Sequence, residues 1–208
     1  MKNSAHEHVA HYYDATAWEY RLVLDLNHHH GLHFGYYDVA HQTYPEASLN
    51  MNRILANRAK VRRGMRVLDA GCGIGGSSIW LAKHKSVSVV GITLSTKQCA
   101  QAQSLTKDSG ISEKTTFLVQ DYTRTQFPNA NFDVVWAVES VCHAPQKIKF
   151  LKEAYRLLRP GGTLIVADGF RAKRRYSPGE ERLMRTWLDG WVVSDIDHHE
   201  DFVKKMTQ

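Results

Sequence analysis

From residue 61 onward, short apolar runs alternate with segments in which apolar residues recur at helical spacing. The runs are rich in β-branched residues, which favours buried strands. We expect strands at 65–71, 88–94, 115–121, 131–140 and 163–169. We expect helices between them at 77–84, at 95–110 with Ser95 as N-cap, and within 145–162, where Pro160 and the glycine pair stop the helix. This alternation predicts βαβ units and a mainly parallel, doubly wound α/β sheet.

The first 60 residues follow a different pattern. Val9, Tyr12 and Tyr13 fall at near-helical spacing, and 47–60 predicts a second helix. Between them, 28–38 places two glycines among aromatic residues, which indicates a loop that closes on something. We therefore divide the chain into an N-terminal helical cap with a closing loop, 1–60, and an α/β domain, 61–208.

Composition is that of an ordinary globular domain. The chain has 208 residues, 43% of them hydrophobic and 23% charged. It contains no apolar run of about 18 residues, so we expect no membrane span, and its polar start does not resemble a secretory signal. A cytoplasmic protein is the default. Cys72, Cys99 and Cys142 are widely spaced, which argues against a disulfide framework or a zinc knuckle.

The formal net charge of +6 raises the question of an anionic partner. The densest basic cluster is 171–175, and it is either a solvated loop or a contact for an anionic substrate or nucleic acid; we consider nucleic acid the weaker alternative. The chain has 12 histidines, including the run His28, His29 and His30. Three consecutive histidines cannot all face one ion from a regular element, so we predict no metal.

Ligands of doubly wound sheets bind beyond the carboxyl ends of the strands, where strand order reverses. After the first predicted strand, Gly71, Gly73 and Gly76 satisfy GxGxxG, a weak signal by itself. The second strand ends at 91–95 without the carboxylate that nicotinamide binders use for ribose. Asp69, two residues before the first glycine, suits a ligand with ammonium and sulfonium groups. A glycine turn without any ligand is the alternative.

Three stretches carry a family resemblance: VLDAGCGIGGSSIWLA, GITLSTKQ and ESVCHAPQKIKFLKEAYRLLRPGGTLIVAD. They resemble the motifs of class I S-adenosylmethionine-dependent methyltransferases with a Rossmann-like fold. Within that class, they look like the tocopherol, sarcosine and phosphoethanolamine methyltransferase subgroup, which is related to cyclopropane-fatty-acid and mycolic-acid synthases. The stretches occur in the family's order and spacing, over about residues 10–170.

The resemblance implies S-adenosyl-L-methionine as cofactor and assigns its contacts. The glycines would line the methionine part, Asp69 and Glu139 would lie beside it, and second-strand residues would take the ribose without the usual acidic residue. Aromatic residues of the N-terminal cap, Tyr13 and Tyr20, would close over the cofactor, or else pack as an ordinary helix face. The implied cofactor residues are Tyr13, His33, Asp69, Gly71, Gly73, Gly75, Thr93, Leu94, Gln98, Asp121, Tyr122 and Glu139.

His143 is the candidate catalytic base, because it follows the fourth strand on the cofactor side and imidazole titrates near working pH. It could instead cap the next helix. Asp168, at the end of the fifth strand, could orient His143, polarise the acceptor or cap the following segment; Glu139 is the third catalytic candidate. Trp187 and Trp191 are either core residues or part of an acceptor pocket suited to a flat or apolar molecule.

The expected function is methyl transfer to O, N or C of a small metabolite. A cyclopropane-synthase-like or cyclase use of the pocket, or a cofactor-binding module without catalysis, are the alternatives, and a nicotinamide oxidoreductase is a distant one. The family pattern ends in two further strands, whereas here 198–208 predicts a helix and no strand pair follows. We interpret this as a truncated form, a sheet completed by a partner in a possible homo-oligomer, or a shortened homologue.

Overall fold

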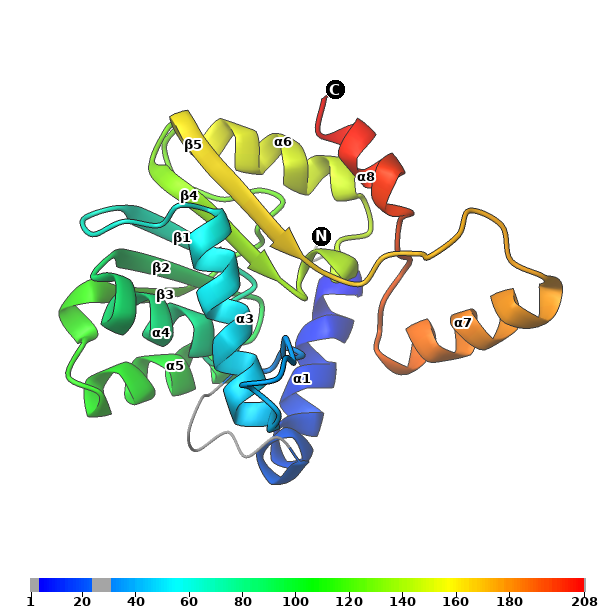
Figure 1. Ribbon diagram of the computed structural model, residues 1–208, viewed down its shortest axis with the longest axis horizontal. Helices are drawn as coiled ribbons and strands as arrows, with labels where there is room; N and C mark the ends of the chain where they lie inside the picture. The colour runs from blue at the N-terminus through cyan, green and yellow to red at the C-terminus, as the bar shows by residue number, and fades with distance from the viewer. Residues whose placement is uncertain (1–3, 24–30, 208) are drawn as a thin grey trace.

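A computed structural model describes residues 4–23 and 31–207 (Figure 1). Its elements are α1 (Ser4–Val23), α3 (Tyr44–Arg58), β1 (Arg66–Ala70), α4 (Gly76–Lys85), β2 (Ser88–Thr93), α5 (Thr96–Asp108), η1 (Ser112–Lys114), β3 (Thr115–Val119), β4 (Phe132–Val138), η2 (Val141–His143), α6 (Lys147–Leu157), β5 (Leu158–Ala167), α7 (Pro178–Gly190) and α8 (His199–Lys205).

The five described strands form one sheet in the order β3-β2-β1-β4-β5, with every neighbouring pair parallel. The doubly wound α/β fold is thereby confirmed. The chain runs from β1 outward to β3 and then returns to β4 on the other side of β1. The carboxyl ends of β1 and β4 therefore flank the point where strand order reverses, which is the usual ligand position in such sheets.

Alternate residues of each strand face opposite sides, so the sheet buries two apolar layers. On one side, Val67 of β1 and Trp136 of β4 pack with Leu55 of α3 and Leu81 of α4. On the other side, strand residues pack with α6 and with Phe202 of α8. Figure 1 shows the same division, with α3, α4 and α5 on one face and α6 and α8 on the other. Helix α7 stands out from the body of the domain.

Two expected boundaries need correction. The helix predicted within 145–162 ends at Leu157, and the strand predicted over 163–169 is the ten-residue β5. The helix cannot continue because Leu158 already pairs with Phe132 of β4, and a register shift follows within that strand pair. Strand pairing thus takes over before Pro160 could stop the helix. The N-cap prediction for α5 is confirmed, since the Ser95 hydroxyl accepts from the Gln98 amide at 3.0 Å.

Helix α1 lies across the carboxyl ends of the strands and is held there by long-range bonds. Asp14 accepts a short hydrogen bond from the Ser95 hydroxyl. The Tyr13 hydroxyl lies 2.9 Å from Nε2 of His143. These contacts place an N-terminal helix over the ligand-binding edge of the sheet.

Within the described ranges, no helix has the length and apolar character needed to cross a bilayer. The described residues also contain no group of three or more His, Cys, Asp or Glu side chains arranged to hold a metal ion. The predicted histidine run, His28 to His30, and the side chain of Tyr20 lie outside what the structure describes.

Candidate functional site

The glycine turn after β1 requires glycine at its first position. Gly71 has a φ of +89°, and a Cβ there would lie 2.4 Å from the Ser140 Cβ. Gly71 and Cys72 both donate their amides to the Ile92 carbonyl at 2.9 Å, which fixes the turn against the end of β2. Gly73 and Gly75 also have positive φ values, of +53° and +89°. The turn thus brings bare backbone to the edge of a cavity beside β1.

That cavity, about 560 Å³ of empty space that is partly open to solvent, lies under α1 at the switch point between β1 and β4. Its walls come from the cap, the glycine turn, the β2 end and the β4 end. The lining residues are Val9, Ala10, Tyr13, Leu32, Gly71, Gly73, Thr93, Leu94, Ser95, Gln98, Tyr122, Glu139, Ser140 and His143.

At the β2 end, the Thr93 hydroxyl donates to Oε1 of Gln98 at 2.7 Å, and both side chains are buried. This bond orients the Gln98 amide so that its nitrogen lies 4.0 Å from the position of a Cβ on Gly73. Tyr122 donates to the Ser140 carbonyl at 2.7 Å, and burial raises the pKa of its hydroxyl well above the usual value. The ring is therefore a neutral wall of the cavity.

A buried carboxyl group, of Asp69, and a half-buried one, of Glu139, lie at the β1 and β4 ends. Glu139 accepts from the Phe34 amide at 2.9 Å, and burial, helped by the charge of Asp168, raises its pKa to about 7. Asp69 accepts from the Ser78 hydroxyl at 2.6 Å, and burial raises its pKa to about 6. Glu139 and Asp69 also line a smaller adjoining cavity together with buried His33. A ligand carrying an ammonium group would stabilise both carboxylates in their charged form.

His143 follows β4 in the short helix η2, and both of its ring nitrogens have partners. Nε2 lies 2.9 Å from the Tyr13 hydroxyl, and Nδ1 lies 3.3 Å from the Val192 carbonyl. Burial lowers the pKa of His143, which favours the neutral imidazole. Asp168 instead accepts from the amides of Cys142 and Gly169, at 3.0 and 2.8 Å. Its bond from Cys142 is that of a cap for η2, which lies before Asp168 in the chain and is not the following segment that the sequence suggested.

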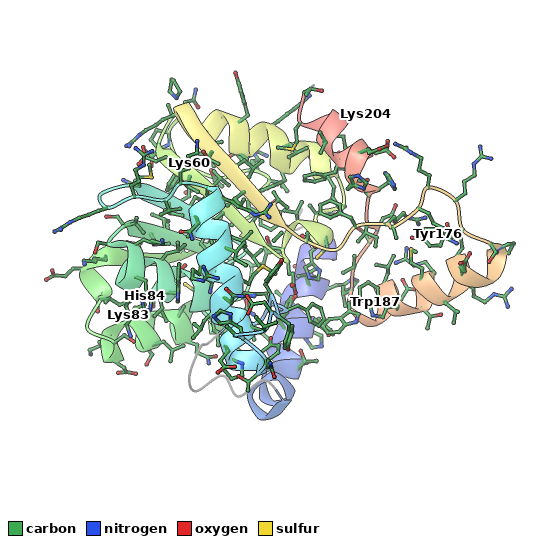
Figure 2. The ribbon with its side chains drawn as sticks, in the orientation of Figure 1. Lys60, Lys83, His84, Tyr176, Trp187 and Lys204 are labelled. Atoms are coloured by element: carbon green, nitrogen blue, oxygen red, sulfur yellow. The ribbon has the colours of Figure 1, made fainter. Side chains whose placement is uncertain are left out.

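A second, larger cavity of about 1080 Å³ adjoins the first. The two share Tyr13, Leu32, Glu139 and His143 as a common wall. The larger cavity is otherwise mainly apolar, with Trp187 and Trp191 from the α7 region at a ring separation of 6.3 Å. Trp187 is 51% exposed and lies near the end of α7 that approaches the body of the domain (Figure 2). Both tryptophans line the cavity, and Trp191 also packs against the buried cluster of Leu188, Val193 and Ile196, so it combines the two roles considered.

Residues 68–166 match the family described as a methyltransferase domain. Among curated relatives, 27-O-demethylrifamycin SV methyltransferase of Amycolatopsis mediterranei is 37% identical over 75% of this chain and 56% of its own length. The 2-methyl-6-phytyl-1,4-hydroquinone methyltransferase of Synechocystis is 41% identical over 69% of this chain and 45% of its own. Together these matches support a class I S-adenosylmethionine-dependent methyltransferase.

Solved structures agree on the fold. A geranyl diphosphate methyltransferase matches with a TM-score of 0.86 at 20% identity, over 98% of this chain and 79% of its own. The [4+2]-cyclase SpnF matches with a TM-score of 0.82 at 24% identity, over 98% and 71%. At these identities the likeness concerns architecture. The chain spans about half the length of the first curated relatives, from 45% to 58%.

S-adenosylmethionine is the cofactor of this methyltransferase class, and the residues present fit it. Bare glycine backbone, two carboxyl groups and the neutral ring of Tyr122 surround the first cavity and its extension. Asp121 is a partial exception among the expected residues. Its carboxylate accepts from the Thr123 amide and hydroxyl, at 2.7 and 2.8 Å, and it is not among the residues that line the two cavities.

Several lining residues of the candidate site were not assigned a role from the sequence. Val9 and Ala10 face the cavity from α1, and Leu32 belongs to the wall shared by both cavities. Ser140, one residue beyond Glu139, donates to the Ala70 carbonyl at 2.6 Å and packs against Gly71. Ser140 lies within the fourth-strand motif, so its position at the end of a strand could have identified it as a lining residue. The apolar residues of α1 carry no such signal, because their contacts depend on how the helix docks.

Proposed function

We propose that this chain transfers a methyl group from S-adenosylmethionine to O, N or C of a small, largely apolar metabolite. The shared wall of the two cavities is the observation that supports it. Tyr13, Glu139 and His143 each face both the cofactor cavity and the larger apolar cavity. A group on that wall can contact the cofactor's reactive end and the acceptor together, which is the positioning that methyl transfer requires.

Bound S-adenosylmethionine supplies an electrophilic methyl group, so the protein's own tasks are positioning and removal of one proton. We propose that His143 is the base for an acceptor hydroxyl or other activatable group. The Tyr13 hydroxyl, 2.9 Å from Nε2, would pass its own proton to Nε2 while its oxygen receives the proton of the acceptor. The burial and lowered pKa of His143 favour a neutral imidazole that is able to accept. We propose that Glu139 and Asp69 bind the amino group of the cofactor and that Asp168 holds η2 in place.

The acceptor class follows from the walls of the larger cavity. Among the residues that the structure describes, none of those lining it is a lysine or an arginine. Phe34, Phe170, Trp187 and Trp191 supply aromatic surface instead. A phosphorylated acceptor would find no cation there, so we favour a neutral, flat or prenylated molecule such as a natural-product phenol or quinol. The tocopherol O-methyltransferase of Arabidopsis, 33% identical over 84% of this chain, is named for such an acceptor.

The other proposals concern the two parts of the chain and its basic cluster. We propose that 1–60 closes over the cofactor and that 61–208 binds it. The basic cluster at 171–175 fits a solvated loop better than an anion site, since Arg171, Lys173 and Arg174 pair with Glu181, Glu180 and Asp201 at 2.6–2.8 Å. Binding of nucleic acid is accordingly not part of the proposal. A cytoplasmic location and a homo-oligomer stay predictions from sequence.

Two experiments test this function. Calorimetry should show binding of S-adenosylhomocysteine and not of NAD; no binding at millimolar levels would overturn the proposal. Incubation with labelled S-adenosylmethionine and 2-methyl-6-phytyl-1,4-hydroquinone, 27-O-demethylrifamycin SV or a host metabolite extract should give a product heavier by one methyl group. Cofactor binding without any methylated product would favour the non-catalytic module.

A substitution at His143 tests its proposed role as the base. His143→Gln should lower turnover by about a hundredfold or more and leave the affinity for S-adenosylhomocysteine nearly unchanged. His84→Gln, at an exposed histidine of α4, is the matched control (Figure 2). Equal turnover in the two variants would show that His143 is not the base.

A further inference from the structure

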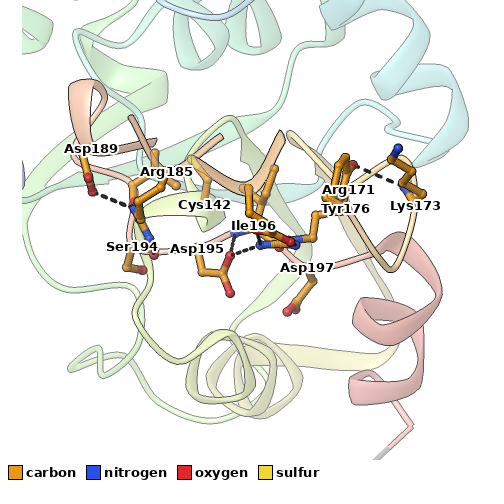
Figure 3. Close-up of polar contacts among 12 residues, drawn as sticks. Cys142, Arg171, Lys173, Tyr176, Arg185, Asp189, Ser194, Asp195, Ile196 and Asp197 are labelled. Atoms are coloured by element: carbon orange, nitrogen blue, oxygen red, sulfur yellow. Dashed lines mark hydrogen bonds and ion pairs between the residues drawn. The ribbon is translucent and has the colours of Figure 1, made fainter. Parts of the chain in front are cut away.

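The segment between α7 and α8, residues 192–197, has all six of its backbone carbonyls bonded. Val192 O faces Nδ1 of His143, while Val193 O and Ser194 O accept from Arg185 at 2.8 Å each. Asp195 O accepts from Lys147 at 2.8 Å. The last two, of Ile196 and Asp197, accept from the side chain and the backbone amide of Arg171, at 3.2 and 2.9 Å. Figure 3 shows Arg171 and Arg185 gathered around this segment. An irregular segment has no strand partner to satisfy its carbonyls, and here cationic side chains satisfy most of them.

Val192 begins this segment in an unfavourable conformation. Its amide bonds to Asp189 O and the next amide to Leu188 O, which is the Schellman arrangement that ends a helix with a left-handed residue. Gly110 fills the same position after α5 with a φ of +66°, whereas Val192 has a φ of +55°. A β-branched residue in this region is strained and persists only where its surroundings over-determine it. The result of this geometry is that the Val192 carbonyl faces His143.

Lys147 connects this segment to the turn that carries His143. It is only 8% exposed, and its ammonium donates to the carbonyls of Cys142, Ala144 and Asp195 at 2.9, 2.8 and 2.8 Å. An ammonium group has three N–H donors, so these bonds use all of them. The first two acceptors are the residues on either side of His143. One buried cation therefore fixes both the backbone of His143 and the segment that supplies its Nδ1 partner.

A backbone carbonyl can only accept a hydrogen bond, so the Val192 carbonyl requires the proton of neutral His143 to be on Nδ1. Nε2 is then left with its lone pair. We propose that Lys147 and Arg185 are positioning residues that hold His143 in this tautomer by fixing the Val192 carbonyl. The proposal rests on the proposed role of His143 as the base, since the tautomer matters for turnover only if Nε2 takes up a proton.

Several ionisable groups surround His143, so a pH profile alone would not isolate this effect. Helix α1 contributes His8 and Tyr13, and the β4 end contributes Glu139 and Cys142. Lys147, Asp168, Arg185 and Asp189 approach from α6, the β5 end and α7. The tautomer itself is the direct readout. Two-bond ¹⁵N–¹H correlation spectra distinguish the protonated ring nitrogen, and His143→Gln identifies the signals of His143.

The test compares Arg185→Met and Lys147→Met with Arg182→Met and Lys152→Met, which remove exposed cations from the same helices. We expect the Nδ1–H form of His143 in the wild type and both controls, and a mixture with the Nε2–H form in the two test variants. Their turnover with 2-methyl-6-phytyl-1,4-hydroquinone, or with the acceptor found in the metabolite extract, should fall at least fivefold. Affinity for S-adenosylhomocysteine should stay within twofold.

Arg185 keeps the test decisive if Lys147→Met does not fold, because the Arg185 side chain is 47% exposed and its loss leaves no buried charge. An unchanged tautomer in folded Arg185→Met would overturn the positioning role, whatever the turnover. A changed tautomer with undiminished turnover would support the positioning role and show instead that His143 is not the base. The failure of this inference and the failure of the proposed function are thus separate observations.

Discussion

The hydroxyl of Tyr13 lies 2.9 Å from Nε2 of His143, across 130 positions of sequence. The two rings meet edge to face with their centroids 5.5 Å apart. Because Nδ1 of His143 faces a carbonyl, Tyr13 must be the donor in this bond. The helix that covers the first cavity is therefore bonded to the nitrogen that we propose as the proton acceptor.

Tyr13→Phe keeps the ring and removes this donor. A neutral hydrogen bond contributes about 1 kcal/mol, equivalent to roughly a five- to tenfold effect, so turnover should fall by at least that factor while α1 still docks. Tyr12→Phe, the same change at the adjacent position of α1, is the control. Steady-state kinetics of both variants would check this. A loss of similar size in Tyr12→Phe would indicate damage to the helix rather than to the bond.

Gly71→Ala should both destabilise the fold and abolish cofactor binding. The left-handed conformation costs a residue with a Cβ about 1–2 kcal/mol, and the new Cβ would also lie 2.4 Å from that of Ser140. Gly64→Ala is the matched control, because Gly64 has a φ of +84° with nothing within 4 Å of its Cβ position. Chemical denaturation should give a larger loss of unfolding free energy for Gly71→Ala. Equal losses would mean that Ser140 moves aside freely.

Features determined by local sequence were predictable. Ser95 and Gly110 bracket α5 because an N-cap hydroxyl and a left-handed glycine act within one helical turn. The strand ends that carry Gly71 and Glu139 followed from the apolar runs before them. The end of α6 was not predictable from the Pro160 signal, because pairing of Leu158 with Phe132 of β4 competes with the helix and is a tertiary contact.

The groups that contact His143 could not be predicted from the sequence either. Tyr13 is 130 positions away and the Val192 carbonyl is 49 positions away, and no spacing rule connects them. Asp168 was expected near His143, but a strand-end position does not tell whether a carboxylate will bond an imidazole or the Cys142 amide. Lys147 reads as an ordinary charged residue at the start of a helix, and its burial depends on the 192–197 segment folding over it.

Glu139 should make the cofactor-free protein less stable as pH rises. Its folded pKa of about 7 lies above the ordinary 4.5, so the folded state holds a proton that the unfolded state has already released. Its contribution is therefore fully present below about pH 4.5 and is lost as pH rises through 7. Melting temperatures from pH 5 to 8.5 should fall less steeply in Glu139→Gln than in the wild type. Parallel curves would show that Glu139 does not titrate in this range.

The raised pKa of Glu139 also predicts that cofactor binding releases part of a proton. The amino group of S-adenosylhomocysteine favours ionised Glu139, so binding near pH 6.5 should expel part of a proton. Calorimetry in two buffers of different ionisation enthalpy would measure this release. It should shrink at pH 8.5, where Glu139 is already charged, and in Glu139→Gln. Release that persists unchanged in the variant would assign the proton to another group, with Asp69 the next candidate.

Trp187→Ala and Trp191→Ala should weaken acceptor binding and leave the cofactor site intact. Both rings line the larger cavity and neither lines the cofactor cavity. Aromatic anchors of a pocket typically contribute more than 1 kcal/mol when truncated, so KM for an apolar acceptor should rise by about tenfold. Leu183→Ala removes a 74% exposed apolar residue from the same helix and controls for changes in α7 itself. A similar rise in KM for Leu183→Ala, or a matching loss of S-adenosylhomocysteine affinity, would mean that α7 acts through the fold as a whole and that the acceptor lies elsewhere.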